Sequence, residues 1–542
     1  MARNGTVAES VVEALKEMGV KYVFGVPSGG WVDYMEALRK ADGIEFVLTT
    51  HEGGAGMMAD VCGRLTGKPG ACFGTFGPGA TNLATGVGEA LLDRSPVIAF
   101  TDEMPEAMRG RTTQMGIDHQ ALFQPLTKKT TRLRAGAVKS ILFDAGRVAL
   151  EGRPGPVHVG LPVGMSALEA TKENVAFSPP SPPRPADSTL VEQAAKLFAS
   201  AKKPLLAVGL GAVKARVEND IRALAEKHNL PVVLTPMAKG MLGEDHRCYA
   251  GVVFHALSDM VGETHQQADL VVAIGYDPVE FNYESWMPNA LLVSFDIEPA
   301  DIDRSSYVVA VDAVGDIKAS LAALLALAPI KHEWDMRALA GRKAAMFKKL
   351  KPSNGAFGPK AALMVLREVL PQDGIMTCDV GAHTHLIGQL WRTPAPGLQL
   401  MTNGWSTMGF GIPAAIAAKL VHPEKHVCTV VGDGGFLMTA GELATALRCD
   451  AKIVVVLLTD NDLALIRIKQ EKKHNPIYGT PVRDKGTLGS DAVFGVPVRT
   501  AHDPSEFRKA LEWAFASESS AIVEAVIDSH EYDGVVLKKD KQ

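Results

Sequence analysis

The sequence lacks the features that mark secreted, membrane or nucleic-acid-binding proteins. Its six cysteines, at positions 62, 72, 248, 378, 428 and 449, include no Cys-x-x-Cys spacing, so neither a zinc site nor a disulfide framework is predicted. A formal net charge of only −5 over 542 residues gives no electrostatic reason to expect binding to nucleic acid or to an anionic membrane. No apolar run approaches the length of a membrane span, and the first 19 residues lack the apolar core of a signal peptide. We therefore expect a cytoplasmic globular protein with buried free thiols.

Two stretches of the chain are predicted to be linkers. They are AFSPPSPPRPADS at 176–188 and LKPSNGAFGPK at 350–360. The first is rich in proline, which has no amide donor and cannot continue a helix or a central strand. The linkers predict three domains, over 1–175, 189–335 and 360–542. Near the N-terminus, Thr6 and Glu9 have the spacing of a capping box and predict the start of a helix.

Within each predicted domain, short apolar runs alternate with longer helical patterns. The clearest runs are KYVFGV, ACFGTFG, SPVIAFT, KPLLAVGLG, DLVVAIG, LLVSFDI, HVCTVVGDG and KIVVVLLTD. Continuous β-branched runs bounded by glycine are typical of strands that are buried on both faces, as in parallel sheets covered by helices. We predict an α/β protein with three doubly wound parallel-sheet domains. Ligands in such domains bind at the carboxyl ends of the strands.

Two of these predicted strand ends carry carboxylates. Asp433 ends one strand within Gly-Asp-Gly-Gly, and Asp460 ends another 27 residues later, with one crossing helix expected over 438–449. This spacing fits one βαβ unit, so the two carboxylates are expected to meet. The glycines allow close approach of a ligand and expose amides where phosphate is favoured. Carboxylates beside phosphate require a cation between them, and oxygen ligands suit magnesium. On the residues alone, Asp and Gly at these places could also be ordinary turn residues.

Several segments together resemble thiamine diphosphate-dependent enzymes. They are TTHEGGAGMMADVCGRLTGKPG, GPGATNLATGVGEALLD, CDVGAHTHLIGQLW, TNGWSTMGFGIPAAIAA and the Gly432–Asp462 element. QMGIDHQALFQPLTK and VVAIGYDPVEF are similar to acetolactate synthases, in particular to their flavin-free catabolic branch. The resemblance implies a pyrimidine-binding domain, a central Rossmann-like domain and a diphosphate-binding domain. It also implies decarboxylation of a 2-oxo acid, carboligation of the resulting carbanion to a second carbonyl, and a homodimer or homotetramer in which the first and third domains meet across subunits.

The resemblance also assigns roles to individual residues. Glu52 would exchange a proton with the pyrimidine ring of the cofactor, which suits a carboxyl group held away from water. Gln114 would contact the substrate, although an exposed loop glutamine is equally expected there. Asp433 and Asp460 would bind Mg²⁺ through their side chains, and Asp462 through its carbonyl. Met408 would wedge beneath the bent cofactor. The cofactor contacts implied are Gly77, Pro78, Val380, Gly381, Ala382, His383, Ser406, Met408, Gly432, Asp433, Gly434 and Gly435.

Two departures from the acetolactate synthase pattern concern the substrate. Gly30 stands where the flavin-free branch commonly has a lysine, and Lys469 stands at a place that helps to set acceptor specificity; a solvated lysine is the plainer interpretation of Lys469. FAD is not expected, because Gly275-Tyr276-Asp277-Pro278 stands where flavin-binding members carry basic residues, and AVGLGAVKARVE lacks a full Gly-x-Gly-x-x-Gly. A simple 2-oxo acid decarboxylase, a thiamine-dependent carbon–carbon lyase and a non-catalytic cofactor-binding protein remain alternatives.

Overall fold

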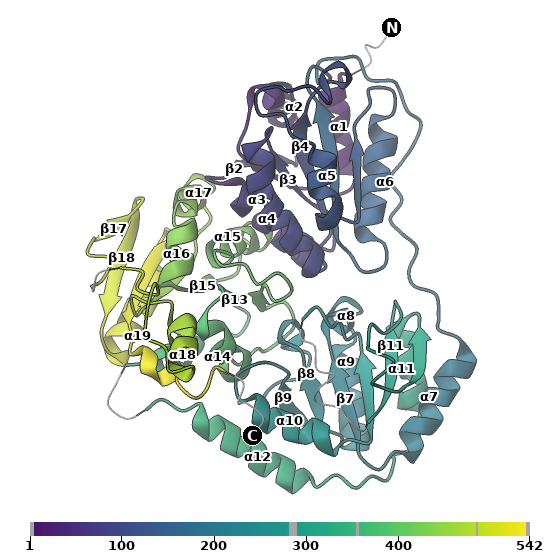
Figure 1. Cartoon of the computed structure of the whole chain (residues 1–542), viewed down its shortest axis with the longest axis vertical. Coiled ribbons are helices and arrows are strands. Elements are labelled where there is room, and N and C mark those ends of the chain that lie inside the picture. The colour runs from purple at the N-terminus through teal and green to yellow at the C-terminus, as the bar shows by residue number, and fades with distance from the viewer. Residues whose placement is uncertain (1–4, 281–289, 354–356, 484–485, 538–542) are drawn as a thin grey trace.

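The computed structural model describes residues 5–280, 290–353, 357–483 and 486–537. Residues 354–356 of the second predicted linker fall outside this set. Figure 1 shows three bodies, each built around its own sheet. The first linker has the expected character, because residues 171–187 contain neither helix nor strand. The chain is an α/β protein with three parallel-sheet domains, as the apolar runs predict.

The first domain contains a parallel sheet with the strand order β2-β1-β3-β4-β6-β5. Helix α1 begins with the predicted capping box, in which Thr6 and Glu9 each accept the other's backbone amide. The strands are β1 (Tyr22–Gly25), β2 (Glu45–Leu48), β3 (Gly70–Gly74), β4 (Val97–Glu103), β5 (Lys129–Arg132) and β6 (Pro156–Pro162), and the helices are α1 (Val7–Glu17), α2 (Val32–Lys40), α3 (Glu52–Thr66), α4 (Pro78–Leu92), α5 (His119–Phe123) and α6 (Val138–Leu150).

The central domain contains a second parallel sheet, with the order β12-β11-β10-β7-β8-β9. The order reverses between β7 and β10, so a crevice is expected where these two strands end. The strands are β7 (Pro204–Val208), β8 (Val232–Leu234), β9 (Tyr249–Val252), β10 (Leu270–Ile274), β11 (Leu291–Asp296) and β12 (Val309–Val314), and the helices are α7 (Ser188–Ser200), α8 (Leu210–Lys214), α9 (Glu218–His228), α10 (Ser258–Gln267) and α11 (Ile317–Ala326). Helix α12 (Met336–Lys349) then runs along the molecule toward the third domain (Figure 1).

The third domain contains a sheet with the order β14-β13-β15-β16-β19-β18-β17, in which the β17–β18 pair alone among the described pairings is antiparallel. The strands are β13 (Ile375–Cys378), β14 (Gln399–Met401), β15 (Val427–Gly432), β16 (Val454–Thr459), β17 (Ala492–Val493), β18 (Val496–Ala501) and β19 (Ala521–Val526), and the helices are α13 (Pro359–Val369), α14 (Ala382–Leu390), α15 (Gly411–Val421), α16 (Asp433–Thr439), α17 (Glu442–Arg448), α18 (Ala464–Lys472) and α19 (Pro504–Ala516).

The connection between β15 and β16 differs from the prediction in one respect. The strands are parallel neighbours, with Gly432 opposite Leu458, so the predicted βαβ unit is present. The prediction of a single helix over 438–449 was wrong, because the structure has two helices, α16 and α17, which are separated at Ala440 and Gly441. Helix α16 begins at Asp433 itself, which places the carboxylate in its first turn. An acidic group is favourable at this position of a helix.

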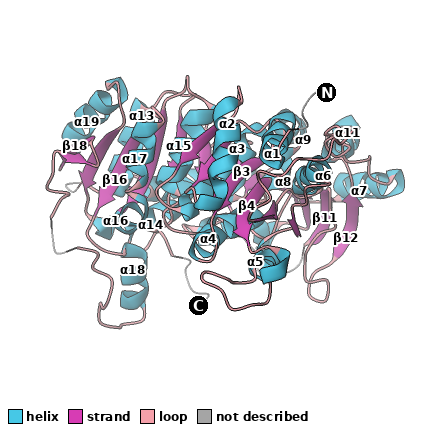
Figure 2. Ribbon diagram, turned by 90° about the horizontal axis from the view of Figure 1, so that it is seen from above, coloured by secondary structure: helices cyan, strands magenta, loops and turns pink. Residues whose placement is uncertain are grey.

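The first and third domains share an apolar core. Helix α3 packs against α15, and the two helices lie side by side in the perpendicular view of Figure 2. Trp405, which the sequence left unexplained, packs beside α4, because a Cβ atom added to Gly88 would lie 2.8 Å from the indole ring. Helix α18 projects from the third domain (Figure 2). Within the described residues, no helix is long and apolar enough to cross a membrane.

Candidate active site

The two strand-end carboxylates predicted to meet lie together at the ends of β15 and β16. Asp433 Oδ2 accepts hydrogen bonds from the backbone amides of Asp460, at 2.9 Å, and Asn461, at 2.8 Å. Both carboxylates are largely shielded from water, and burial together with the Asp433 charge raises the pKa of Asp460 to about 7. Two close, buried carboxylates cannot both be ionised cheaply. A cation between them would remove this cost.

The donor set at this place fits a hard cation. Besides the two carboxylates, Oδ1 of Asn461 and Oδ1 of Asp462 are buried and have no hydrogen-bond partner among the described residues. Carboxylate, amide and carbonyl oxygens are the ligands that Mg²⁺ and Ca²⁺ take in proteins. Arg483, which sequence reasoning missed, lies with Nη2 2.5 Å from Asp433 Oδ1. Its guanidinium supplies positive charge at this edge of the sheet, and no local spacing in the sequence connects residue 483 to residue 433.

Next to the carboxylates lies a cavity of about 120 Å³. Most of the predicted cofactor contacts in this part of the chain line it, together with the three predicted metal ligands. The lining includes Val380, Gly381, Ala382, His383, Met408, Gly432, Asp433, Gly434, Gly435, Asp460 and Asp462. Met408 lies over the glycine turn, since a Cβ atom added to Gly434 would be 2.8 Å from its methyl carbon. Ser406 does not line the cavity and has a left-handed backbone, with φ +55°.

A buried carboxylate missed by the sequence reasoning organises this cavity. Asp379, at the end of β13, accepts hydrogen bonds from the amides of Val380, Gly409 and Gly411. These bonds hold the segment that follows Met408 against the start of α14. Burial raises the pKa of Asp379 to about 6 in spite of the three amides. Tyr532, far along the chain, also lines the cavity, and no local sequence signal marks it.

Glu52 lies in the first domain, at the first position of α3, and is 8% exposed. Its Oε2 accepts a hydrogen bond from Asn82 Nδ2 at 3.0 Å. From the third domain, Glu442 accepts the amides of Thr50 and His51 and so fixes the turn that leads to Glu52. Glu52 is not among the residues that line the cavity at Asp433. Among the described residues of one chain, Glu52 and the predicted diphosphate contacts therefore do not line the same cavity.

The loop that contains the predicted cofactor contacts Gly77 and Pro78 lies beside Glu52. Gly77 has φ +45° and precedes Pro78, the first residue of α4. The conformation requires glycine, because a Cβ atom there would lie 2.9 Å from the carbonyl oxygen of Met115. A Cβ atom on Gly79 would lie 3.2 Å from Glu52 Oε1, so the loop contacts the carboxylate closely. Gln114 is exposed, in the loop that packs over Gly77.

Gly30 lies against a carboxylate that sequence reasoning did not single out. A Cβ atom added to Gly30 would be 2.8 Å from Asp102 Oδ1. Asp102 is buried at the end of β4 and accepts hydrogen bonds from the hydroxyls of Ser28 and Thr75. Burial raises the pKa of Asp102, and the two hydroxyls act against this rise. At the position where the flavin-free branch commonly has a lysine, this chain therefore has a glycine with an acidic side chain beneath it.

Lys469 is exposed on α18, one turn beyond Leu465 and Ile466, which line the cavity. These three residues lie on the same face of the helix. The charge of Lys469 contributes to the lowered pKa of His385, after burial and the neighbouring His255. The rings of His255 and His385 are 5.0 Å apart. Arg467 is buried and paired with Glu471 and Asp533, and its Nε lies 3.9 Å from Oδ2 of Asp462, although Arg467 itself does not line the cavity.

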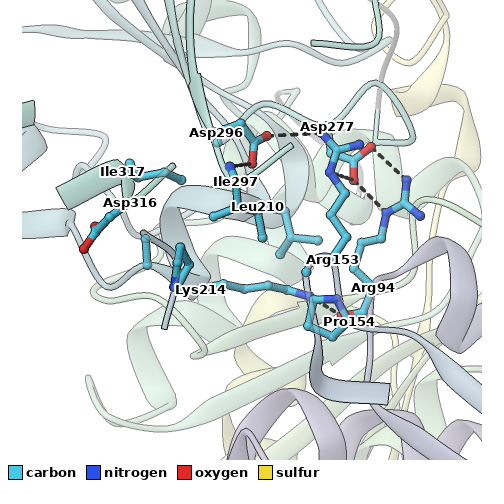
Figure 3. Close-up of a pocket in the computed structure, with 15 residues that line it drawn as sticks. Arg94, Arg153, Pro154, Leu210, Lys214, Asp277, Asp296, Ile297, Asp316 and Ile317 are labelled. Carbon is cyan, nitrogen blue, oxygen red and sulfur yellow. Dashed lines mark hydrogen bonds and ion pairs between the residues drawn. The ribbon is translucent and has the colours of Figure 1, made fainter. Parts of the chain in front are cut away.

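The crevice where β7 and β10 end is held by ion pairs between the first and central domains (Figure 3). Arg94 donates to both carboxylate oxygens of Asp277, at 2.7 and 3.2 Å. Arg153 donates to Asp296 at 3.2 Å. The crevice has a volume of about 260 Å³ and is also lined by Asp316. Both arginines are engaged by carboxylates, and Lys214 is a third basic residue that lines the crevice.

Comparison with known proteins agrees with this geometry. Three family models match: the N-terminal domain of thiamine pyrophosphate enzymes at residues 5–122, their central domain at 191–324 and their C-terminal domain at 379–525. A probable acetolactate synthase large subunit of Methanocaldococcus jannaschii is 32% identical over 97% of this chain and 92% of its own. The acetolactate synthase of Bacillus subtilis is 31% identical over 98% and 95%. The acetolactate synthase large subunit of Lactococcus lactis is 32% identical over 86% of this chain and 82% of its own.

Proposed function

Because this chain belongs to the family of thiamine pyrophosphate enzymes, we propose specific roles for its residues in the decarboxylation of a 2-oxo acid and the joining of the product to a second carbonyl. The reaction type is that of an acetolactate synthase-like enzyme. When bound, thiamine diphosphate supplies the carbon nucleophile and the electron sink. The observation that carries the residue assignment is the pair of carboxylates at the ends of β15 and β16, beside a glycine turn and a cavity.

The residues of the third domain bind the diphosphate and its cation in this proposal. Asp433 and Asp460 hold Mg²⁺ with their side chains and Asp462 with its carbonyl oxygen. The glycines of the turn leave room for the phosphates, and the amides at the start of α16 favour negative charge. Met408, which lines the cavity, would contact the cofactor, and Asp379 keeps that segment in place through its bonds to Gly409 and Gly411.

Glu52 is the proton-transferring group in this proposal. It is shielded from water and held by Asn82, which suits exchange of a proton with a ring nitrogen of the cofactor. Gly77 and Pro78 flank the same ring, and Gln114, in the adjoining loop, contacts the substrate. We also propose that the enzyme works without FAD, because Asp277 and Asp296 occupy the crevice of the central domain, and that it acts in the cytoplasm, where its free cysteines stay reduced.

A direct test of the function is incubation with thiamine diphosphate, Mg²⁺ and pyruvate, other 2-oxo acids or aldehydes, followed by product analysis. A coupled product containing two carbonyl-derived fragments is the expected result. Release of free aldehyde alone would instead indicate a simple decarboxylase. One observation favours the simple decarboxylase. The flavin-free acetolactate synthases that this chain resembles commonly have a lysine at position 30, whereas this chain has Gly30 with the acidic Asp102 beneath it.

We further propose that each site is completed by a second copy of the chain, because Glu52 does not line the cavity at Asp433. Two inactive variants test this. In a mixed dimer of E52Q and D433A chains, sites shared between chains leave one site intact and one doubly altered. Co-expressed, differently tagged chains, purified through both tags, should regain activity that neither variant has alone. If each chain carries its own complete site, the mixed dimer stays inactive.

Lys469 is proposed to favour a substrate with a second anionic group. Lys469→Gln should raise the KM for a dicarboxylic 2-oxo acid several-fold and leave the KM for pyruvate nearly unchanged, since an exposed charge contact is worth about 0–1 kcal/mol. Lys473→Gln is the matched control, because Lys473 is exposed just past the end of α18. Two results would show that Lys469 does not recognise the substrate. One is an equal change of KM for both substrates in Lys469→Gln, and the other is an equal change of KM for the dicarboxylic substrate in both variants.

A further inference from the structure

Three consecutive residues at the end of β4 point in alternate directions. Asp102 faces Ser28 and Thr75, whereas Thr101 and Glu103 face the opposite side, as expected from the two-residue period of a strand. On that opposite side lie two histidines, His119 and His158, which are 2% and 0% exposed. Asp102 lies beneath Gly30 in the site described above, whereas the other four residues, Thr101, Glu103, His119 and His158, have no part in that site.

A continuous chain of hydrogen bonds runs through this group. The amide of Gly77 lies 3.3 Å from His119 Nε2, and His119 Nδ1 lies 2.8 Å from Thr101 Oγ1. The same hydroxyl lies 2.8 Å from His158 Nε2. His158 Nδ1 lies 2.7 Å from Thr130 Oγ1, which in turn donates to Gln120 at 2.7 Å. Gln120 donates to Glu103, whose other oxygen accepts from Arg132.

The direction of every bond follows from its first donor. A backbone N–H can only donate, so Nε2 of His119 accepts and its proton is on Nδ1. Nδ1–H then donates to Thr101. At the other end of the network, Thr130 donates to Gln120, so it accepts from Nδ1–H of His158, whose Nε2 accepts from Thr101. His158 in turn carries its proton on Nδ1 and donates to Thr130. Both rings have to be neutral for this pattern, and burial lowers the pKa of His119 to about 4 and holds the pKa of His158 well below its usual value.

The last residue of this chain of hydrogen bonds, Glu103, explains why all of the bonds donate in one direction. The carboxylate of Glu103 can only accept, and it is buried beside the guanidinium of Arg132. The chain therefore begins at an obligatory donor and ends at an obligatory acceptor. Glu103, His119 and His158 lie close enough to suggest a metal site, but both nitrogens of each ring already take part in these bonds. The geometry points to a positioning device rather than to metal binding.

We propose that Thr101, His119 and His158 are positioning residues that hold the Gly77 turn, and with it Gly79 against Glu52, in the form that receives the pyrimidine ring of the cofactor. The turn needs such support because its backbone, at φ +45° and ψ −99°, lies outside the common regions. Its amide has His119 as its acceptor, and its next residues begin α4 beside Glu52. The inference rests on the proposed function, which defines what the turn receives.

Thr101→Val tests the proposal, because it keeps the shape of the side chain and removes the hydroxyl that joins the two histidines. It should weaken thiamine diphosphate binding about 10- to 100-fold, the range typical of residues that orient a ligand-binding group. Thr101→Ser, which restores the hydroxyl, should bring the dissociation constant back to within about 3-fold of wild type. Thr130→Val, on the edge strand β5, breaks the same chain one link further out and should act in the same direction.

Thr127→Val is the matched control. Thr127 is a buried threonine of the same domain whose hydroxyl donates to the carbonyl of Phe123, outside the chain. Cofactor dissociation constants, from tryptophan fluorescence, are compared with the apo-protein melting temperature for each variant. Equal weakening by Thr127→Val and Thr101→Val, or unchanged binding in folded Thr101→Val and Thr130→Val, would overturn the proposal. Failure of wild type to bind thiamine diphosphate would instead overturn the proposed function.

The ring protonation gives a second, independent readout. In ¹⁵N-histidine NMR spectra at neutral pH, His119 and His158 should both be neutral with the proton on Nδ1. Substitution of each histidine by glutamine assigns the two signals. A proton on Nε2 of either ring would contradict the direction of the chain, whether or not the cofactor is bound.

Discussion

Glu52→Gln should bind thiamine diphosphate and yet exchange the thiazolium proton at least about 10²-fold more slowly than wild type. Glutamine keeps the size of the side chain, and its amide oxygen can still accept the bond from Asn82. It cannot take up and release a proton. Exchange is measured as deuterium uptake at the thiazolium carbon by quenched-flow NMR, in parallel with the dissociation constant of the cofactor.

The control for this experiment is Asn82→Ala, which leaves the Glu52 carboxylate in place and removes its hydrogen-bond donor. It should slow the exchange much less than Glu52→Gln does. A wild-type exchange rate in Glu52→Gln would mean that another group transfers the proton. Loss of cofactor binding in Glu52→Gln, with exchange normal at saturation, would assign Glu52 to binding alone.

Asp433→Ala should abolish tight, Mg²⁺-dependent binding of thiamine diphosphate and all turnover. The side chain holds the proposed cation and also accepts the amides of Asp460 and Asn461. Leaving buried amides unpaired costs about 1–3 kcal/mol each, so the variant should also melt at a lower temperature. Chelation of Mg²⁺ in the wild type should release the cofactor without this loss of stability. Calorimetric titration with and without Mg²⁺ measures the binding.

Asp460→Asn separates the binding of the cation by an oxygen atom from the negative charge at position 460. An amide oxygen can still bind the cation, and the substitution removes the negative charge that burial and the neighbouring Asp433 both disfavour at position 460, as the raised pKa of Asp460 shows. Asp460→Asn should therefore keep Mg²⁺-dependent binding of thiamine diphosphate. Tight cofactor binding by Asp433→Ala in excess chelator would contradict the metal site altogether. Loss of binding in Asp460→Asn at an unchanged melting temperature would show that a charged ligand is needed at position 460.

The sequence by itself determined the buried strands formed by its clearest apolar runs and the meeting of Asp433 with Asp460. These features depend on local rules, since apolar β-branched runs form strands and one βαβ unit joins neighbouring parallel strands. The capping box of Thr6 and Glu9 follows from the same kind of local geometry. The position of Glu52 at the start of α3 could likewise be expected, because Glu52 ends an apolar run and is followed by Gly-Gly-Ala.

Only the tertiary structure decided which distant residues complete the site. Arg483 reaches Asp433, Asp379 orders the segment after Met408, and Asp102 lies beneath Gly30. Each pair is separated by tens of residues with no periodic relation, and such contacts arise from the packing of whole elements. The break between α16 and α17 is also tertiary, because Glu442, the first residue of α17, bonds across to the first domain. Local sequence preferences determine where helices and strands form, whereas the packing of these elements against one another determines which distant side chains come into contact.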